Sequence, residues 1–346
     1  MKNKNKLGSS GIGGQAVIEG IMMRNKDWYS VAVRKSDNTI EVEKKQYKSA
    51  SQKNKILGAP FIRGVFSFID SLVLGIKSLT YSASFFEDDD ETEEEPGKLE
   101  LWLINKFGEK AENVIMGCVV AVSIIFSVLI FMMLPLFIAD MFERFVPGIG
   151  NRQVPVIEGI AKMVIFIGYM LLISLMKDIR RTFMYHGAEH KCINCIENGK
   201  ILTVENVRES SRFHKRCGTS FMLIVLIISI LFFIFIRSDV VWIKYTIRLI
   251  LIPVIAGVSY EIIRLAGSSD NFIVNLISKP GIWMQKITTK EPTDDMIEVA
   301  IKAVEAVFDW KEYLKENGIK VEKKEETSLP KEYKQVIEGS GYNWKY

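Results

Sequence analysis

Apolar residues are concentrated in the middle of the chain, in four segments that are each about as long as a membrane span. These segments cover roughly residues 113–139, 156–176, 220–236 and 240–263. About 20 apolar residues in a helix are enough to cross the hydrocarbon core of a bilayer. Only Arg237, Ser238 and Asp239 separate the last two segments, so we expect a tight helical hairpin there. The pattern predicts a mainly α-helical, polytopic membrane bundle with four transmembrane helices.

Lysine and arginine residues are distributed unevenly between the loops that join these segments. The loop 177–219 carries nine of them, whereas the loop 140–155 carries two, Arg144 and Arg152. Loops rich in Lys and Arg stay in the cytoplasm. We therefore predict a multi-pass protein of the cell membrane in which both termini and the loop 177–219 are cytoplasmic.

Both ends of the chain are polar and are expected to lie outside the bilayer. Polar and apolar positions alternate on both sides of a turn signal at Ser36-Asp37-Asn38, which predicts β-strands. The expected parts are a cytoplasmic β-rich segment over 1–55, the membrane domain over 99–267 and a cytoplasmic C-terminal segment over 268–318. In the last of these we expect an irregular stretch over 280–285, followed by a helix capped by Thr293 or Asp294.

Residues 56–86 are also apolar, but charged residues interrupt them regularly. Arg63, Asp70 and Lys77 recur every seven residues and form one polar stripe along a helix. This is typical of an amphipathic helix at the membrane surface, with a fifth span as the alternative. The acidic run over 87–98 and the polar tail over 319–346 are predicted to be a disordered linker and a mostly disordered tail.

The overall charge adds one exclusion. The 346 residues carry a formal net charge of +4, which is too small to indicate nucleic-acid binding. Membrane lipids are the expected partners, together with another membrane protein or a cytoplasmic protein.

All three histidines of the chain lie in the predicted cytoplasmic loop. His186 and His190 are one helical turn apart, so both rings fall on one helix face with Glu189 beside them. In an H-x-x-E-H sequence the histidines bind a divalent metal, usually zinc, and the glutamate activates water. His214 and Cys217 follow at the start of the third apolar segment and would add nitrogen and sulfur ligands.

Other polar residues are weaker candidates. Cys192-x-x-Cys195 is a metal-binding or redox pair, or two buried small hydrophobes. Arg248 lies inside the fourth apolar segment, where it forms an interhelical structural pair or belongs to a polar pathway. Further candidates lie in the glycine-bracketed run 13–24 and at the end of the fourth segment: Gln15, Glu19, Arg24, Glu261 and Arg264.

Several long strings resemble the YqhQ-like family of bacterial membrane proteins, and together they cover most of residues 10–310. They are Gly13–Arg24, Tyr185–Lys191, Arg212–Ser220, Ser259–Gly267, Pro280–Gln285 and Thr288–Pro292. The resemblance implies a predicted metal-dependent enzyme of unknown function. In the family pattern Pro stands at the position of Lys215, and Cys192 is not required.

These observations support two interpretations of function. In the first, the chain is a metal-dependent hydrolase with Glu189 as general base. In the second, it is a membrane scaffold or a factor for membrane-protein biogenesis, in which the histidines and glutamates form a structural hydrogen-bond network without a metal.

Overall fold

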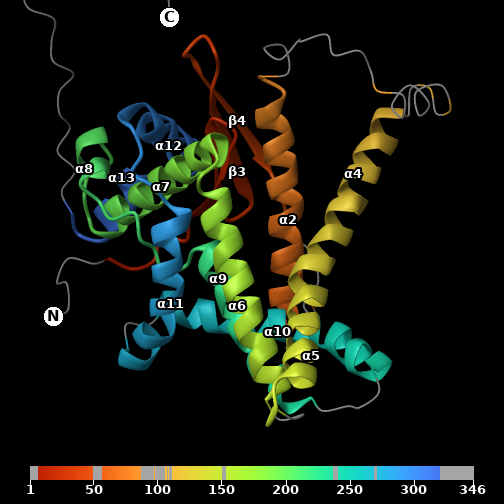
Figure 1. The fold of residues 1–346 in the computed structure, drawn as a ribbon. Coiled ribbons are helices and arrows are strands. Elements are labelled where there is room, and N and C mark those ends of the chain that lie inside the picture. The colour runs from red at the N-terminus through yellow and green to blue at the C-terminus, as the bar shows by residue number, and fades with distance from the viewer. Residues whose placement is uncertain are drawn as a thin grey trace, which may run out of the picture. The chain divides into compact units, whose positions relative to one another are not determined.

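The computed structural model describes residues 7–49, 57–86, 97, 106, 108, 111–149, 153–236, 241–268 and 271–319 (Figure 1). The chain divides into a first unit, residues 1–308, and a second unit, residues 309–346. The described helix of the second unit is α13 (Trp310–Glu316). The predicted linker, apart from residue 97, and the predicted tail, apart from residue 319, lie outside the described residues, as does most of the link between the last two apolar segments.

The N-terminal segment forms a four-stranded antiparallel sheet, as its alternating pattern predicts. The strands are β1 (Gly13–Val17), β2 (Gly20–Asn25), β3 (Trp28–Arg34) and β4 (Ile40–Gln46). They lie in the order β1-β2-β3-β4. Val17, Met22, Val31 and Val33 alternate along the strands onto one face, where they pack with Leu74.

Four helices are long and apolar enough to cross a membrane: Gly117–Phe145, Val154–Ile173, Gly218–Phe235 and Thr246–Leu265. The first consists of α4 (Ala111–Val128), the π-helical turn η3 (Leu129–Met133) and α5 (Leu134–Phe145); the others are α6 (Val154–Ile173), α9 (Gly218–Phe235) and α10 (Val241–Ser268). The prediction of four apolar helices is confirmed. The first extends past its predicted end, because the polar residues of α5 continue the helix.

The helix predicted within 56–86 is α2 (Ile62–Ala83). It contacts β1 and β3 of the sheet and also α10. In Figure 1 one end of α2 lies beside the sheet and the other end lies at α10. Its hydropathy does not place it among the four apolar helices found in the described part of the chain.

The polar loop 177–219 begins with a separate helix, α7 (Lys177–Glu197). It is a separate helix from α6, because Met176 has an extended backbone with ψ 134°. Figure 1 shows α7 lying across the end of α6. Helix α7 runs through Gly187 without interruption. A short helix, α8 (Val204–Arg208), follows and is capped by the Thr203 side chain.

The C-terminal part differs from the prediction in one element. Residues 280–285, expected to be irregular, belong to helix α11 (Phe272–Thr288), which contains Pro280 and packs against α9. Tertiary packing overrides the local effect of proline and glycine here: Gly281 lies against Ser220 so closely that a Cβ would come within 2.6 Å of the Ser220 side chain.

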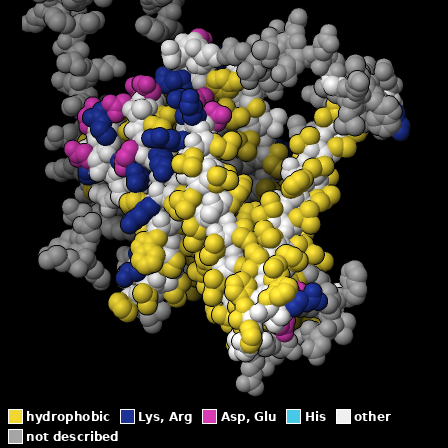
Figure 2. Space-filling model, viewed as in Figure 1, with side chains coloured by type: hydrophobic (Ala, Val, Ile, Leu, Met, Phe, Trp, Pro, Cys, Tyr) yellow, Lys and Arg dark blue, Asp and Glu magenta, His cyan; other side chains and the backbone are white. Residues whose placement is uncertain are grey.

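Helix α12 (Asp294–Val307) begins after Thr293, as predicted. It packs on β2, β3 and α7, and Ser30 of β3 donates a hydrogen bond to the Ala303 carbonyl at 2.6 Å. We refer to β1–β4, α7, α8 and α12 together as the polar layer. Figure 2 shows charged side chains gathered over α7, α8 and α12, and hydrophobic side chains over α4, α5 and α6.

Candidate metal centre

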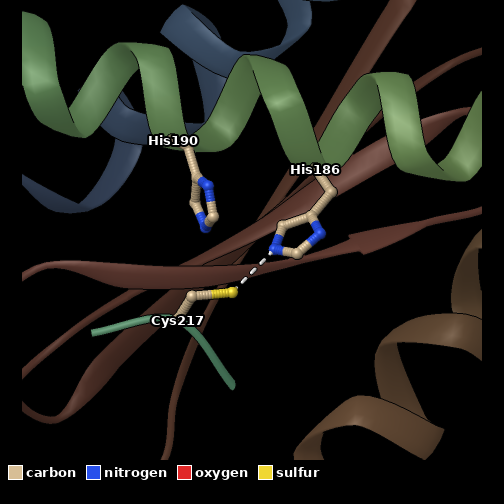
Figure 3. A group of neighbouring side chains, drawn as sticks. All are labelled: His186, His190 and Cys217. Atoms are coloured by element: carbon tan, nitrogen blue, oxygen red, sulfur yellow. Dashed lines mark hydrogen bonds between the residues drawn. The ribbon is translucent and has the colours of Figure 1, made fainter. Parts of the chain in front are cut away.

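His186, His190 and Cys217 form one compact cluster. One possible ligand atom from each residue lies within 4.8 Å of the other two. Figure 3 shows both imidazoles projecting from the same side of α7, with Cys217 opposite them. The shared face follows from the four-residue spacing on a helix. Cys217 reaches the cluster because it is the N-cap residue of α9.

The two histidine rings are oriented by backbone carbonyl groups. His186 Nδ1 lies 2.9 Å from the Thr288 carbonyl oxygen, and His190 Nδ1 lies 2.6 Å from the Arg212 carbonyl oxygen. A carbonyl can only accept, so each Nδ1 must carry the proton. In a neutral ring this leaves the Nε2 lone pair free to bind a metal, which is how protein metal sites orient histidine ligands.

The sulfur of Cys217 is held by polar partners. It lies 3.3 Å from His186 Nε2 and 3.1 Å from the Thr219 hydroxyl. Burial alone would raise the pKa of the Cys217 thiol, but His186 and His190 outweigh it and hold that pKa well below its usual range. The N-terminus of α9 also favours negative charge at this position. These contacts favour the thiolate form of Cys217, which is the form that binds metals.

In the metal-free protein, His186 carries a charge opposite to that of the Cys217 thiolate. Burial alone would lower the pKa of its imidazole, but Cys217 and Glu189 raise it to about 9. At neutral pH, His186 is thus an imidazolium paired with the Cys217 thiolate. A metal ion that bound here would displace the His186 proton.

Glu189 lies beside the cluster. Its carboxylate is buried and comes within 4.0 Å of His186 Nε2. The packing of β1 on α7 is tight here, since a Cβ on Gly14 would lie 3.1 Å from Glu189 Cγ. The hydrogen bonds found among the described residues do not include one to this carboxylate. Burial of a carboxylate is costly unless it is paired, so Glu189 is well suited to accept a proton from a water molecule or to interact with a cation.

His214, predicted to be a fourth ligand, is near the cluster but is not one of the three grouped residues. Its ring centroid lies 5.7 Å from that of His190, while its Nε2 lies 3.7 Å from the Glu197 carboxylate. Burial, chiefly, lowers the pKa of His214. The Gln285 side chain accepts from the His214 backbone N–H at 2.8 Å and donates to its carbonyl at 2.6 Å. These contacts give His214 a place in a separate network.

Glu197 is the centre of that network. It accepts hydrogen bonds from Arg216 and from the backbone and hydroxyl of Ser10, the latter two at 2.9 Å. Burial alone would raise the pKa of Glu197, but His214 and Arg216 outweigh it and lower the pKa to about 2. The network joins the N-terminal segment to α7 and to the segment that precedes α9.

The candidates in the N-terminal strands do not join the cluster. Gln15 lies against Gly75 of α2. Glu19 holds Arg181 through two 2.5 Å contacts and accepts from the Tyr185 hydroxyl at 3.3 Å. Arg24 stacks over the Tyr47 ring at 5.3 Å. Gln15 and Glu19 thus connect the N-terminal sheet to α2 and α7, respectively, whereas Arg24 packs within the N-terminal segment.

The candidates in the apolar helices form ion pairs elsewhere. Arg248 makes a bidentate pair with Glu158 of α6, at 2.6 and 2.7 Å, which is the interhelical pair that was one of its two predicted roles. Glu261 pairs with Arg63 of α2 at 2.6 Å and lies 4.0 Å from Arg264.

Cys192 and Cys195 are fully buried and unpaired. Burial raises the pKa of Cys192 well above its usual range and that of Cys195 to about 11. Both are neutral thiols, so they match the prediction of small buried hydrophobes.

Sequence reasoning missed the groups that orient the ligands. These are the carbonyl oxygens of Thr288 and Arg212. Sequence reasoning also missed the Gln285 side chain, which holds the His214 backbone. Backbone carbonyl groups leave no pattern in the sequence, but Gly187 is an indirect indication of the Thr288 contact. A Cβ there would lie 2.0 Å from the Lys290 carbonyl oxygen, so glycine is required for the approach of the segment that includes Thr288.

The donor set fits zinc. Two nitrogens and one sulfur suit Zn²⁺. Atoms bound to one tetrahedral zinc through a Zn–N and a Zn–S bond lie about 3.5 Å apart, close to the 3.3 Å between His186 Nε2 and Cys217 Sγ. All three ligand atoms lie within 4.8 Å of one another, so side-chain shifts of about 1 Å are enough to bring them to zinc-binding distances.

Comparison with known proteins gives a family without an assigned activity. Residues 59–310 match the family described as "Protein of unknown function (DUF1385)". The chain is 35% identical over 295 residues to "Uncharacterized protein YqhQ" of Bacillus subtilis (strain 168), which covers 84% of this chain and 90% of that protein. No solved structure matches.

Proposed function

The chain belongs to the DUF1385 family, whose function is unknown, so its activity has to be inferred from the geometry of the candidate site. We propose that the protein is a zinc-dependent hydrolase of the cell membrane. His186, His190 and Cys217 are the proposed ligands. The observation that carries the proposal is the orientation of the two rings: backbone carbonyls hold both Nδ1–H groups, and Nε2 of His186 faces the Cys217 sulfur.

The number of ligands favours catalysis over a structural role. Structural zinc sites have four protein ligands, whereas catalytic sites have three and one open position. Zinc would supply Lewis acidity to the substrate and would acidify a water molecule. Glu189 is the general base, because its buried carboxylate lies beside His186 and can accept a proton from that water. The His186 side chain is 14% exposed, and we infer that the open coordination position lies beside its ring.

The unequal distribution of lysine and arginine between the loops supports a cytoplasmic location of the site. We infer that the polar layer, both termini and the cluster are cytoplasmic, and that α6 and α9 bring the cluster close to the membrane. Cys217 directly precedes the apolar helix Gly218–Phe235. The substrate would therefore be hydrolysed near the cytoplasmic surface of the bilayer.

The deciding experiment is elemental analysis of the full-length protein purified in detergent without chelators. We expect about one zinc ion per wild-type chain, and loss of that zinc in His190→Ala and in Cys217→Ala. Glu189→Gln should retain the zinc and lose turnover of whichever ester, amide or phosphoester the wild type hydrolyses in a substrate panel. His214→Gln is the matched control and should retain the metal.

Three results would contradict the proposal. Metal-free wild-type protein would favour the scaffold interpretation, in which the cluster is a structural network. Zinc that remains in the His186→Ala/His190→Ala double variant would place the metal at another site. Zinc loss accompanied by unfolding, without any hydrolytic activity in the wild type, would make the metal structural.

A further inference from the structure

Two of the three charged residues of α2 are turned away from its exposed face. Arg63 makes a bidentate pair with Glu261 of α10, at 2.8 and 2.6 Å. Asp70 is buried and accepts from the Tyr47 hydroxyl at 2.9 Å and from Ser49. The part of the polar stripe formed by Arg63 and Asp70 therefore faces the protein, and Lys77 near the C-terminal end is exposed. Ion pairing and hydrogen bonding remove most of the cost of charges in an apolar environment.

The outer face of α2 is apolar along most of its length. Its exposed large hydrophobic residues are Ile62, Phe68, Ile69, Leu72, Val73, Ile76 and Leu79. From Ile62 to Leu79 this face extends about 25 Å, at 1.5 Å per residue, against a hydrocarbon core of about 30 Å. Monomeric soluble proteins rarely expose an apolar surface of this extent.

The two ends of α2 contact different parts of the molecule. At the N-terminal end, a Cβ on Gly64 would lie 2.7 Å from Tyr260, and Gly257 lies against the Phe61 backbone. Gly257 and Tyr260 both belong to the apolar helix Thr246–Leu265. At the C-terminal end, Ser82 accepts from the Ile18 backbone N–H at 3.2 Å.

The chain before α2 is also held at the polar layer, since the Tyr47 N–H, directly after β4, donates to the Asp27 carbonyl at 2.7 Å. Both sides of the segment thus connect to the same sheet, while the beginning of α2 reaches the middle of an apolar helix. We propose that α2 is a re-entrant membrane helix whose outer face contacts lipid acyl chains and whose N-terminal end lies deepest in the bilayer. The proposal requires that the four apolar helices cross the membrane and does not depend on a metal.

The surfaces next to α2 indicate that lipid acyl chains cover its outer face. The exposed side chains of α2 continue the apolar surface of α10, against which α2 packs. Lys77 is exposed near the C-terminal end of α2, where a long side chain can reach the headgroups. The sequence pattern indicated a surface helix because three charges lie in α2, whereas the contacts of Arg63 and Asp70 are visible only in the fold.

Site-directed spin labelling of the full chain in lipid vesicles tests the proposal. The background variant is Cys118→Ser, because Cys118 is exposed and the other three cysteines are buried. Labels at Ile62→Cys, Ile69→Cys and Ile76→Cys report three depths on one face. Val164→Cys, on a 64% exposed position of α6, is the lipid control, and Glu41→Cys on the exposed edge of β4 is the water control.

We expect all three α2 labels to collide more often with oxygen than with a water-soluble nickel chelate, as at position 164. Depth should increase steadily from 76 to 69 to 62. Equal shallow depths at the three positions would mean a surface helix, and a maximum at 69 would mean a complete span. Low collision rates with both reagents would mean that a second copy covers the face. Each of these three results would overturn the proposal. A label at 164 that reports water would instead refute the four-span premise.

Discussion

The backbone of Lys290 lies against Gly187 so closely that a Cβ on Gly187 would stand 2.0 Å from the Lys290 carbonyl oxygen. The Lys290 N–H donates to the Phe183 carbonyl of α7 at 2.9 Å. The chain that follows α11 is thereby fixed along α7. This contact holds the Thr288 carbonyl against His186 and so orients one of the proposed ligands.

Gly187→Ala should therefore destabilise the protein, although alanine is the better helix former by about 1 kcal/mol. The added methyl group forces two backbones apart, which we expect to cost about 2 kcal/mol net and to weaken zinc binding. Thermal unfolding in detergent and zinc titration would measure both effects. Gly168→Ala in α6, where a Cβ would meet nothing within 4 Å, is the control. Equal stability of the two variants would contradict the close contact.

Zinc affinity should depend on pH through His186. Its pKa is raised to about 9, so below pH 9 the imidazole is protonated and zinc must displace that proton. Cys217 is already a thiolate and releases none. We expect the zinc association constant to rise about tenfold per pH unit between pH 7 and pH 9 and to level off above. Competition with a chromogenic chelator, corrected for the chelator's own protonation, would measure this. A constant affinity over the same range would disprove the ion pair.

Acid stability should depend on Glu197. Its pKa is lowered from 4.5 to about 2 in the folded state, so the folded state is favoured above pH 4.5 and loses this contribution as the pH falls toward 2. The shift corresponds to about 3 kcal/mol. Glu197→Gln should be less stable at pH 7 and should show a flatter decrease in melting temperature between pH 4.5 and pH 2. A variant with the wild-type acid profile would argue against this role of Glu197.

The buried pair between Glu158 and Arg248 provides a prediction for the apolar helices. Arg248→Met would remove the bidentate partner of a carboxylate that is 2% exposed and leave it the Lys162 ammonium at 2.8 Å. We expect a loss of about 3 kcal/mol, measured by unfolding in mixed micelles, because Lys162 still compensates part of the buried charge. The Glu158→Gln/Arg248→Met double variant should lose less than the sum of the two single variants. Arg264→Met, at an exposed pair 4.0 Å apart, should change little.

The sequence reveals those parts of the fold that have a clear hydrophobic period. The strands alternate every second residue and the apolar helices are continuous, so both could be predicted. The helix through Pro280 could not, because the close contact of Gly281 with Ser220 joins residues that are far apart in the chain. The position of α2 could not be predicted for the same reason, because Arg63 forms an ion pair with Glu261, which is far away in the chain.

The candidate site was predictable to a similar degree. His186 and His190 share a face because of their spacing, and that is visible in the sequence. The sequence shows which residue types could be ligands but not how their side chains are oriented. It therefore could not distinguish Cys217, a proposed ligand, from His214, which is not part of the cluster. Gln285 and Glu197 decide that difference by holding His214 in another network.

The position of α12 on the sheet has a consequence for how the protein is made. Strands β2 and β3 are synthesised long before α12, the helix that covers them. At ordinary rates of translation the interval is about half a minute. During that time the apolar face of the sheet that α12 will cover has no permanent partner, while the four apolar helices are being synthesised. The N-terminal hairpins therefore depend on a temporary protector during synthesis, either a chaperone or the membrane surface itself.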